Sequence, residues 1–133
     1  MAVANWIDGF AVDSQLAFFI PDDFSRVTMA FSDTLKQIPG VSHLAAIQLI
    51  DAADVVTATI ENKPGQTGSL AVYNHLAQTF GAITPEAAKK GLELYAEHTE
   101  DAQANPGKHA NIDRLFGLIE RQETVRVKHL FAV

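Results

Sequence analysis

Three segments of the chain have the residue pattern of β-strands, and two of them predict a hairpin. Residues 44–50 form an almost wholly apolar run, and residues 55–60 form a run rich in β-branched side chains. The segment that joins them, residues 51–54, is short and carries the aspartates typical of a turn. Residues 124–131 alternate apolar and basic side chains, which predicts a half-buried strand whose charges protect a sheet edge.

Four further segments have the apolar spacing of amphipathic helices. They are residues 32–38, a segment from about 69 to 80, a segment from 85 to about 104, and a segment around 112–119. Gly81 ends the second, and Thr84-Pro85 is a strong start signal for the third, with threonine as the cap and proline at the first helical position. The apolar stripe of the third segment runs through Ala88, Leu92, Tyr95, Thr99 and Ala102, so we expect one helix there.

The order of these elements predicts an α+β fold, with a small antiparallel sheet made of the hairpin and the C-terminal strand. The alternation in the hairpin strands is imperfect, so we expect helices to pack on one face of the sheet. We expect the helix that contains Leu92 and Tyr95 to lie across that face.

The first part of the chain differs from the rest, and residues 29–133 are predicted to form a single α+β domain. Residues 1–28 are then an N-terminal extension, packed on the domain or on a partner subunit. Its large apolar residues, Trp6, Phe10, Phe18 and Phe19, favour self-association, because large exposed apolar patches are rare on soluble monomers. We therefore expect a homodimer.

Composition excludes several classes of function. The 133-residue chain has 16 acidic and 10 basic residues, a formal charge of −6, and its basic residues are scattered, so we expect no nucleic-acid partner. It has no cysteine, which excludes disulfides and thiolate chemistry and suits a cytoplasmic protein. No apolar run reaches the roughly 18 residues of a membrane span, so we expect no membrane partner.

The loop between the hairpin and the second predicted helix has the composition of an anion-binding loop. Lys63 would supply charge, Gly65 and Gly68 allow close approach of the backbone, and Ser69 or Thr67 would cap the helix. The pattern is not that of a known nucleotide-binding loop. A structural corner needs the same residues, and that interpretation is the more economical one.

A second set of polar residues follows in the third helix and the loop after it. Tyr95 and His98 lie one helical turn apart, and Lys108 and His109 come just after the Asn105-Pro106-Gly107 turn. Together they would line a polar pocket for a small anion. No histidine has the ligand spacing of a metal site, no cofactor is predicted, and no residue is assigned a catalytic role.

The stretch from Phe31 to Phe116 resembles a small family of uncharacterised bacterial proteins. The matching segments are residues 60–65, 68–70, 92–99, 105–109 and 111–115. The resemblance implies no activity, because none is assigned to that family. Residues 1–28 fall outside it.

Two interpretations of function remain open from the sequence. The first is a non-enzymatic binding or protein-interaction domain of unknown function. The alternative is a small enzyme or sensor that binds an anionic small molecule in the pocket lined by tyrosine, histidine and lysine. Convergence of those side chains in one concave site would favour the alternative.

Overall fold

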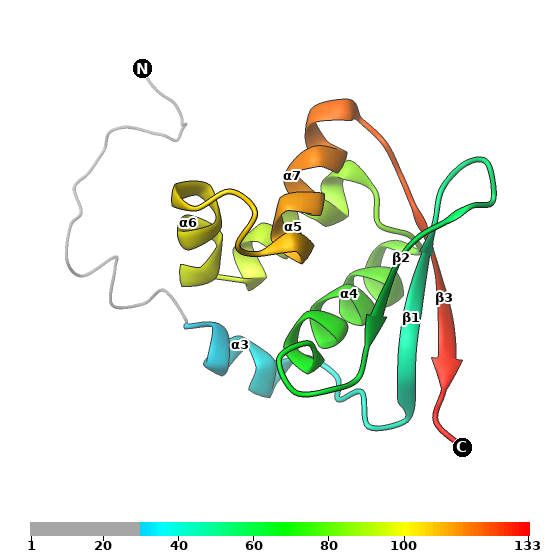
Figure 1. The fold of residues 1–133 in the computed structure, drawn as a ribbon. Helices are drawn as coiled ribbons and strands as arrows, with labels where there is room; N and C mark the ends of the chain where they lie inside the picture. Colours follow the sequence, from blue (N-terminus) through cyan, green and yellow to red (C-terminus); the bar gives the residue numbers. More distant parts are fainter. Residues whose placement is uncertain (1–29) are drawn as a thin grey trace.

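The computed structural model describes residues 30–133, in which five helices flank a three-stranded sheet (Figure 1). The elements are α3 (Phe31–Gln37), β1 (Leu44–Ile50), β2 (Val56–Glu61), α4 (Thr67–Phe80), α5 (Pro85–Leu94), α6 (Glu97–Ala104), α7 (Ala110–Arg121) and β3 (Arg126–Phe131). Within these residues no helix is long and apolar enough to cross a membrane. The expectation for residues 1–28 lies outside the described residues.

The sheet confirms the predicted α+β class. Its strands are antiparallel in the order β2-β1-β3, so the hairpin and the C-terminal strand share one sheet and β3 is an edge. Ile47 in the central strand lies opposite Ile60 on one side and His129 on the other. The turn between β1 and β2 is closed by Asp51, whose Oδ1 accepts the backbone N–H groups of Ala53 and Val55 at 2.9 and 3.0 Å.

Helix α4, and not the helix containing Leu92 and Tyr95, lies against the three strands, which corrects the sequence expectation (Figure 1). Residues 70–74 of α4 are all buried, because the sheet covers one side of this helix and α5 covers another. Helix α5 packs on α4 and α7 instead. Its Lys89, Lys90 and Glu93 are exposed, so only one side of α5 is apolar enough for burial.

Several helix ends follow the sequence signals. Gly81 has a left-handed φ of 84° and ends α4, and the Thr84 hydroxyl caps α5 by accepting the Ala87 N–H at 3.0 Å.

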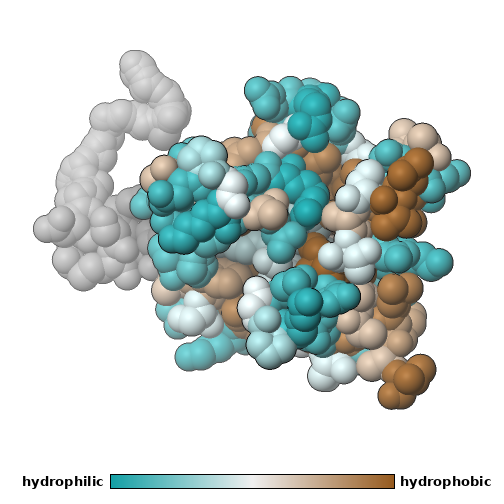
Figure 2. Space-filling view, viewed as in Figure 1, coloured by the Kyte–Doolittle hydropathy of each residue, from teal (hydrophilic) through white to brown (hydrophobic). Residues whose placement is uncertain are grey.

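On the sheet side of the molecule, opposite α3 and α6, apolar side chains are exposed (Figure 2). Val55 and Val56 next to the hairpin turn and Phe131 at the end of β3 are among them.

The predicted third helix is two helices, since the chain breaks at Ala96 between α5 and α6. Ala96 has φ 54° and ψ −121°, a conformation that residues with a Cβ rarely adopt. The break is held on both sides: the Thr99 hydroxyl donates to the Leu92 carbonyl at 2.6 Å, and the Phe31 N–H donates to Glu97 Oε1 at 2.9 Å. No glycine or proline marks the position, so the residue pattern alone runs straight through it.

Replacing Ala96 with glycine is expected to raise the free energy of unfolding by about 1 kcal/mol, because glycine removes the Cβ strain at this φ. Ala77→Gly, within α4, is the matched control and is expected to lower the same free energy by about 1 kcal/mol. Chemical denaturation of both variants measures the two values. Equal destabilisation by both substitutions would contradict a strained junction at Ala96.

Candidate functional site

A pocket of about 450 Å³ lies between α3, the start of α4 and the loop that joins α6 to α7. Seven of the eight candidate residues from the sequence line it: Gly65, Gly68, Ser69, Tyr95, His98, Lys108 and His109. Lys63 does not line it. The Lys63 ammonium pairs with Glu61 Oε1 at 3.0 Å on the exposed surface.

The two glycines of the first loop each have a structural reason to be glycine. Gly65 has φ 89°, which favours a residue without a Cβ. Gly68 packs under the Phe31 ring, and a Cβ at Gly68 would lie 3.1 Å from Phe31 Cε2. The two glycines therefore have a structural role in bringing α3 against the start of α4.

The starts of two helices, α4 and α7, open into this pocket. Helix α4 contributes Gly68 and Ser69, and α7 contributes Ala110 and Asn111. The backbone N–H groups of these four residues have no hydrogen-bond partner within residues 30–133. Neither helix has a side-chain cap at its start. Two positive helix ends therefore face the same concavity.

The expected capping by Thr67 or Ser69 is wrong. The Thr67 hydroxyl donates to Asn62 Oδ1 at 2.8 Å, while Asn62 Nδ2 donates to the carbonyls of Val41 and Leu44. This network ties the loop to the start of β1. The Ser69 hydroxyl is instead the acceptor of a bond from Tyr95 across the pocket.

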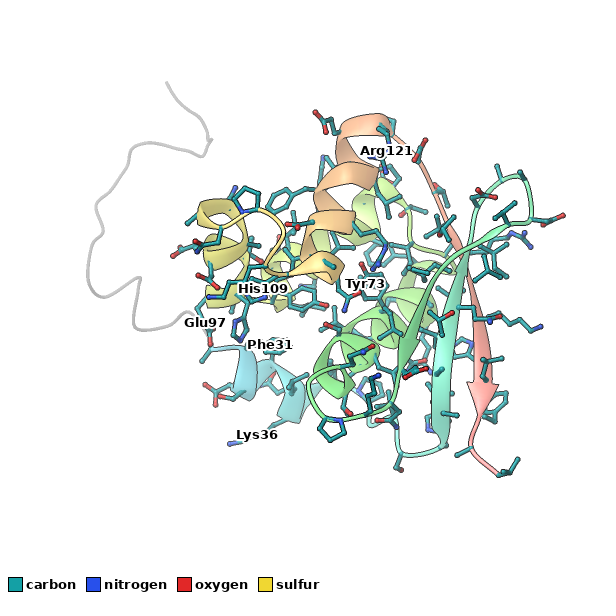
Figure 3. All side chains as sticks on the ribbon, in the orientation of Figure 1. Phe31, Lys36, Tyr73, Glu97, His109 and Arg121 are labelled. Atoms are coloured by element: carbon teal, nitrogen blue, oxygen red, sulfur yellow. The ribbon has the colours of Figure 1, made fainter. Side chains whose placement is uncertain are left out.

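Tyr95 forms the buried side of the pocket. Its hydroxyl donates to Ser69 Oγ at 2.7 Å, and burial raises the pKa of Tyr95 above its ordinary value, so the phenol stays protonated. The Phe31 ring stacks on the Tyr95 ring at 5.3 Å and meets the edge of the His98 ring at 5.1 Å. Figure 3 shows Phe31 and His109 facing this region from α3 and from the loop before α7.

Asp101 in α6 positions the two basic residues of the second loop. His109 Nε2 lies 2.6 Å from Asp101 Oδ2, and Lys108 Nζ lies 3.0 Å from the same oxygen. Hydrogen bonds from His109 and then Lys108 lower the pKa of Asp101 to about 2. Sequence analysis missed this role, because Asp101 stands eight residues before His109 and on the other side of a turn. Asp101 itself does not line the pocket.

The described residues hold no group of three or more metal-binding side chains that would enclose an ion. The pocket lining instead combines free amides, three hydroxyls, two imidazoles and one ammonium group. No acidic residue is among the described residues that line it. Such a donor-rich lining suits an anion better than a cation.

Replacing Asp101 with asparagine is expected to lower the melting temperature at pH 7, because the acceptor for His109 and Lys108 loses its charge. The folded-state pKa of about 2 lies below the ordinary 3.8, so this contribution is present above about pH 4 and is lost as pH falls towards 2. Thermal unfolding measured from pH 7 down to pH 2 should show the difference in melting temperature between Asp101→Asn and wild type falling to zero.

Glu100→Gln is the matched control for that series, since Glu100 is an exposed carboxylate one residue away. It is expected to leave the melting temperature nearly unchanged at every pH. A constant gap between wild type and Asp101→Asn down to pH 2 would contradict the role given to the Asp101 carboxylate.

Comparison with known proteins gives one match. A family model described as "Uncharacterized protein conserved in bacteria (DUF2322)" covers residues 31–129. No curated protein and no solved structure matched the chain.

Proposed function

The chain belongs to the DUF2322 family of uncharacterized proteins conserved in bacteria, a description that names no activity, and we propose that its pocket binds a small anion such as inorganic phosphate. One observation carries the proposal: the starts of α4 and α7 open into a single pocket, with free N–H groups at both. Helix starts attract anions through these amides and through the helix dipole.

The expected affinity is modest. Each helix end contributes about 0.3–1 kcal/mol to the binding of an anion near the surface. Lys108 adds a full charge, but Asp101 lies 3.0 Å from its ammonium and offsets part of it. Hydrogen bonds from the free amides to a charged ligand add about 1.5–3 kcal/mol, so the total is near 4 kcal/mol, which corresponds to a dissociation constant on the order of 1 mM.

We propose binding without catalysis as the function of this pocket. The Tyr95 hydroxyl proton is engaged by Ser69, and the Asp101 carboxylate that bonds His109 lies outside the lining. The structure thus supports the ligand-binding part of the alternative drawn from the sequence. Within residues 30–133 it brings no nucleophilic side chain into contact with a general base.

Titration of nitrogen-15-labelled protein with inorganic phosphate, followed by amide NMR, tests the proposal. We expect saturable shifts of the Gly68, Ser69, Ala110 and Asn111 amides at a midpoint on the order of 1 mM. If no saturable shift appears there by tens of millimolar phosphate, the pocket is a structural corner and not an anion site.

A pair of variants sharpens this test. Ala110→Asp places a negative charge at the exposed start of α7, where an acid favours the helix, and is expected to abolish the phosphate shifts without unfolding the protein. Gln78→Glu adds the same charge on the exposed far end of α4 and is expected to leave the midpoint unchanged. Equal effects of both variants would indicate a nonspecific charge effect.

We also propose that the protein is cytoplasmic and forms a homodimer. The absence of cysteine suits a reducing compartment. Val55, Val56 and Phe131 are 55, 46 and 66% exposed, and the sheet side that carries them supports self-association (Figure 2). The family match begins at residue 31, which supports an extension over residues 1–28 outside the family's domain. Our proposal is that this extension packs on the domain or on the partner subunit.

Sedimentation of the full chain at micromolar concentration is expected to give twice the 14.4 kDa mass of one chain. Phe131→Glu should shift the protein to the monomer, because it places a charge on the exposed apolar end of β3. Phe80→Glu, at a site 40% exposed at the end of α4, is the matched control and should leave the dimer intact. A monomeric wild-type chain would refute the proposal.

A further inference from the structure

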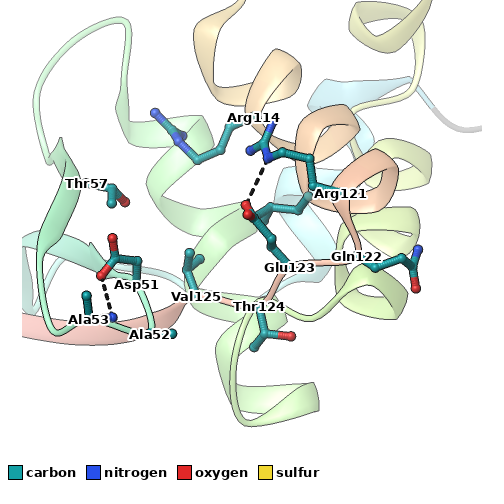
Figure 4. A pocket seen from close by; sticks show the side chains of 11 residues that line it. Asp51, Ala52, Ala53, Thr57, Arg114, Arg121, Gln122, Glu123, Thr124 and Val125 are labelled. Carbon is teal, nitrogen blue, oxygen red and sulfur yellow. Dashed lines mark hydrogen bonds and ion pairs between the residues drawn. The ribbon is translucent and has the colours of Figure 1, made fainter.

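A second pocket, of about 740 Å³, lies beside the C-terminal half of α7 (Figure 4). One wall is the turn between β1 and β2, and the other is α7 with the loop that follows it. Two arginines, Arg114 and Arg121, and two acids, Asp51 and Glu123, line it. The two positive and two negative charges sum to zero. What the pocket attracts therefore depends on which of these side chains pair with one another.

Three of the four charged groups are already engaged. Arg121 Nε donates to Glu123 Oε1 at 2.9 Å, so these two charges neutralise each other. Asp51 Oδ1 accepts the N–H groups of Ala53 and Val55 and closes the hairpin turn. Figure 4 shows the Arg121–Glu123 pair and the bond from the Ala53 N–H to Asp51.

Arg114 is the cation of this pocket that has no acidic partner among the described residues, while the Asp51 carboxylate keeps its negative charge because its partners are backbone N–H groups. Arg114 is half-buried, and its Nη1 donates to the Tyr73 hydroxyl at 3.1 Å and to Asn111 Oδ1 at 2.8 Å. Its Cζ also lies 5.7 Å from the centre of the Tyr73 ring. All of these partners are neutral, and no carboxylate within residues 30–133 pairs with Arg114.

The position of the Arg114 guanidinium is thus fixed while most of its donors remain free. A guanidinium has five N–H donors, and the two bonds to Tyr73 and Asn111 involve Nη1 alone. Nε and Nη2 form the edge that matches the two oxygens of a carboxylate. A guanidinium held in place in this way loses little further freedom when such a group binds.

We propose that this second pocket binds a small organic carboxylate, with Arg114 as its anchor. The volume lies in the range typical of small-molecule sites. The exposed methyl groups of Ala52 and Ala53 offer apolar surface to the body of the ligand, and the buried Leu118 and Val125 lie behind them in the lining. A single negative charge is favoured over two, since the Asp51 and Glu123 carboxylates line the same pocket and repel a second charge.

Titration of the full chain with benzoate, followed by amide NMR, tests the proposal. We expect saturable shifts at Ala52, Ala53 and Thr124, and at the Arg114 Nε–H resonance, below about 10 mM benzoate. Inorganic phosphate is expected to shift these signals at least fivefold less effectively. The absence of saturable benzoate shifts, or equal midpoints for phosphate and benzoate, would overturn the assignment of a carboxylate site.

Two variants locate the anchor. Arg114→Lys keeps the charge but loses the planar two-donor edge, and is expected to weaken benzoate binding about tenfold. This substitution also removes the bonds to Tyr73 and Asn111, so a second variant that keeps Arg114 is needed. Ala53→Glu adds an acid at the exposed rim of the pocket and is expected to weaken benzoate binding at least fivefold.

Gln103→Glu, exposed on α6 and outside this pocket, is the matched control for the added charge and should leave the benzoate midpoint unchanged. The Gly68 and Ser69 amides, which line the first pocket, are followed in the same titration, so that failure at one site is distinguishable from failure at the other. Benzoate binding that survives both Arg114→Lys and Ala53→Glu would overturn the proposal.

Discussion

The burial of α4 is the constraint on which the rest of this fold depends. Residues 70–74 are five consecutive buried positions, so no side of that helix segment is left to solvent. Burying one large apolar side chain contributes roughly 1.5–3 kcal/mol, and α4 places Leu70, Val72 and Leu76 in the core. The sheet and α5 are held together through this shared helix. The start of α4 must then emerge where α3 and the α6–α7 loop meet, which is where the first pocket lies.

Polar groups on α4 fix how it sits in the core. The Tyr73 hydroxyl donates to the Asn111 carbonyl at 2.6 Å, and burial raises the pKa of Tyr73 to about 12 despite the nearby Arg114. Asn74 Oδ1 bonds His129 Nε2 at 2.9 Å across the sheet face, while Asn74 Nδ2 has no partner within residues 30–133. An unsatisfied buried amide costs about 1–3 kcal/mol, so the tie to β3 is made at the expense of stability.

Local patterns predicted the strands, the helix ends and the fold class, because each depends on neighbouring residues. The β-branched run before Ile60 and the left-handed glycine at Gly81 are signals of this kind. The break at Ala96 was not predictable, since it is imposed by contacts from α3 and not by a breaker residue. The sequence indicated most residues of the candidate site but not how they are arranged in space. Lys63 faces solvent, and Asp101 bonds His109 across the turn between α6 and α7, a contact that the spacing of apolar residues does not indicate.

Helix α7 lines both pockets and presents different hydrogen-bond donors to each. Asp113, the acid in its first turn, accepts the Gly107 N–H at 2.9 Å, so this carboxylate is committed to the preceding loop and does not cap the Ala110 and Asn111 amides. Those amides remain open to the first pocket. Arg114 stands about one turn further along the helix, and Arg121 lies in the last turn, where the dipole favours positive charge. The backbone donors at the start of α7 and the Arg114 guanidinium one turn further along thus give one helix two different ways to bind an anion.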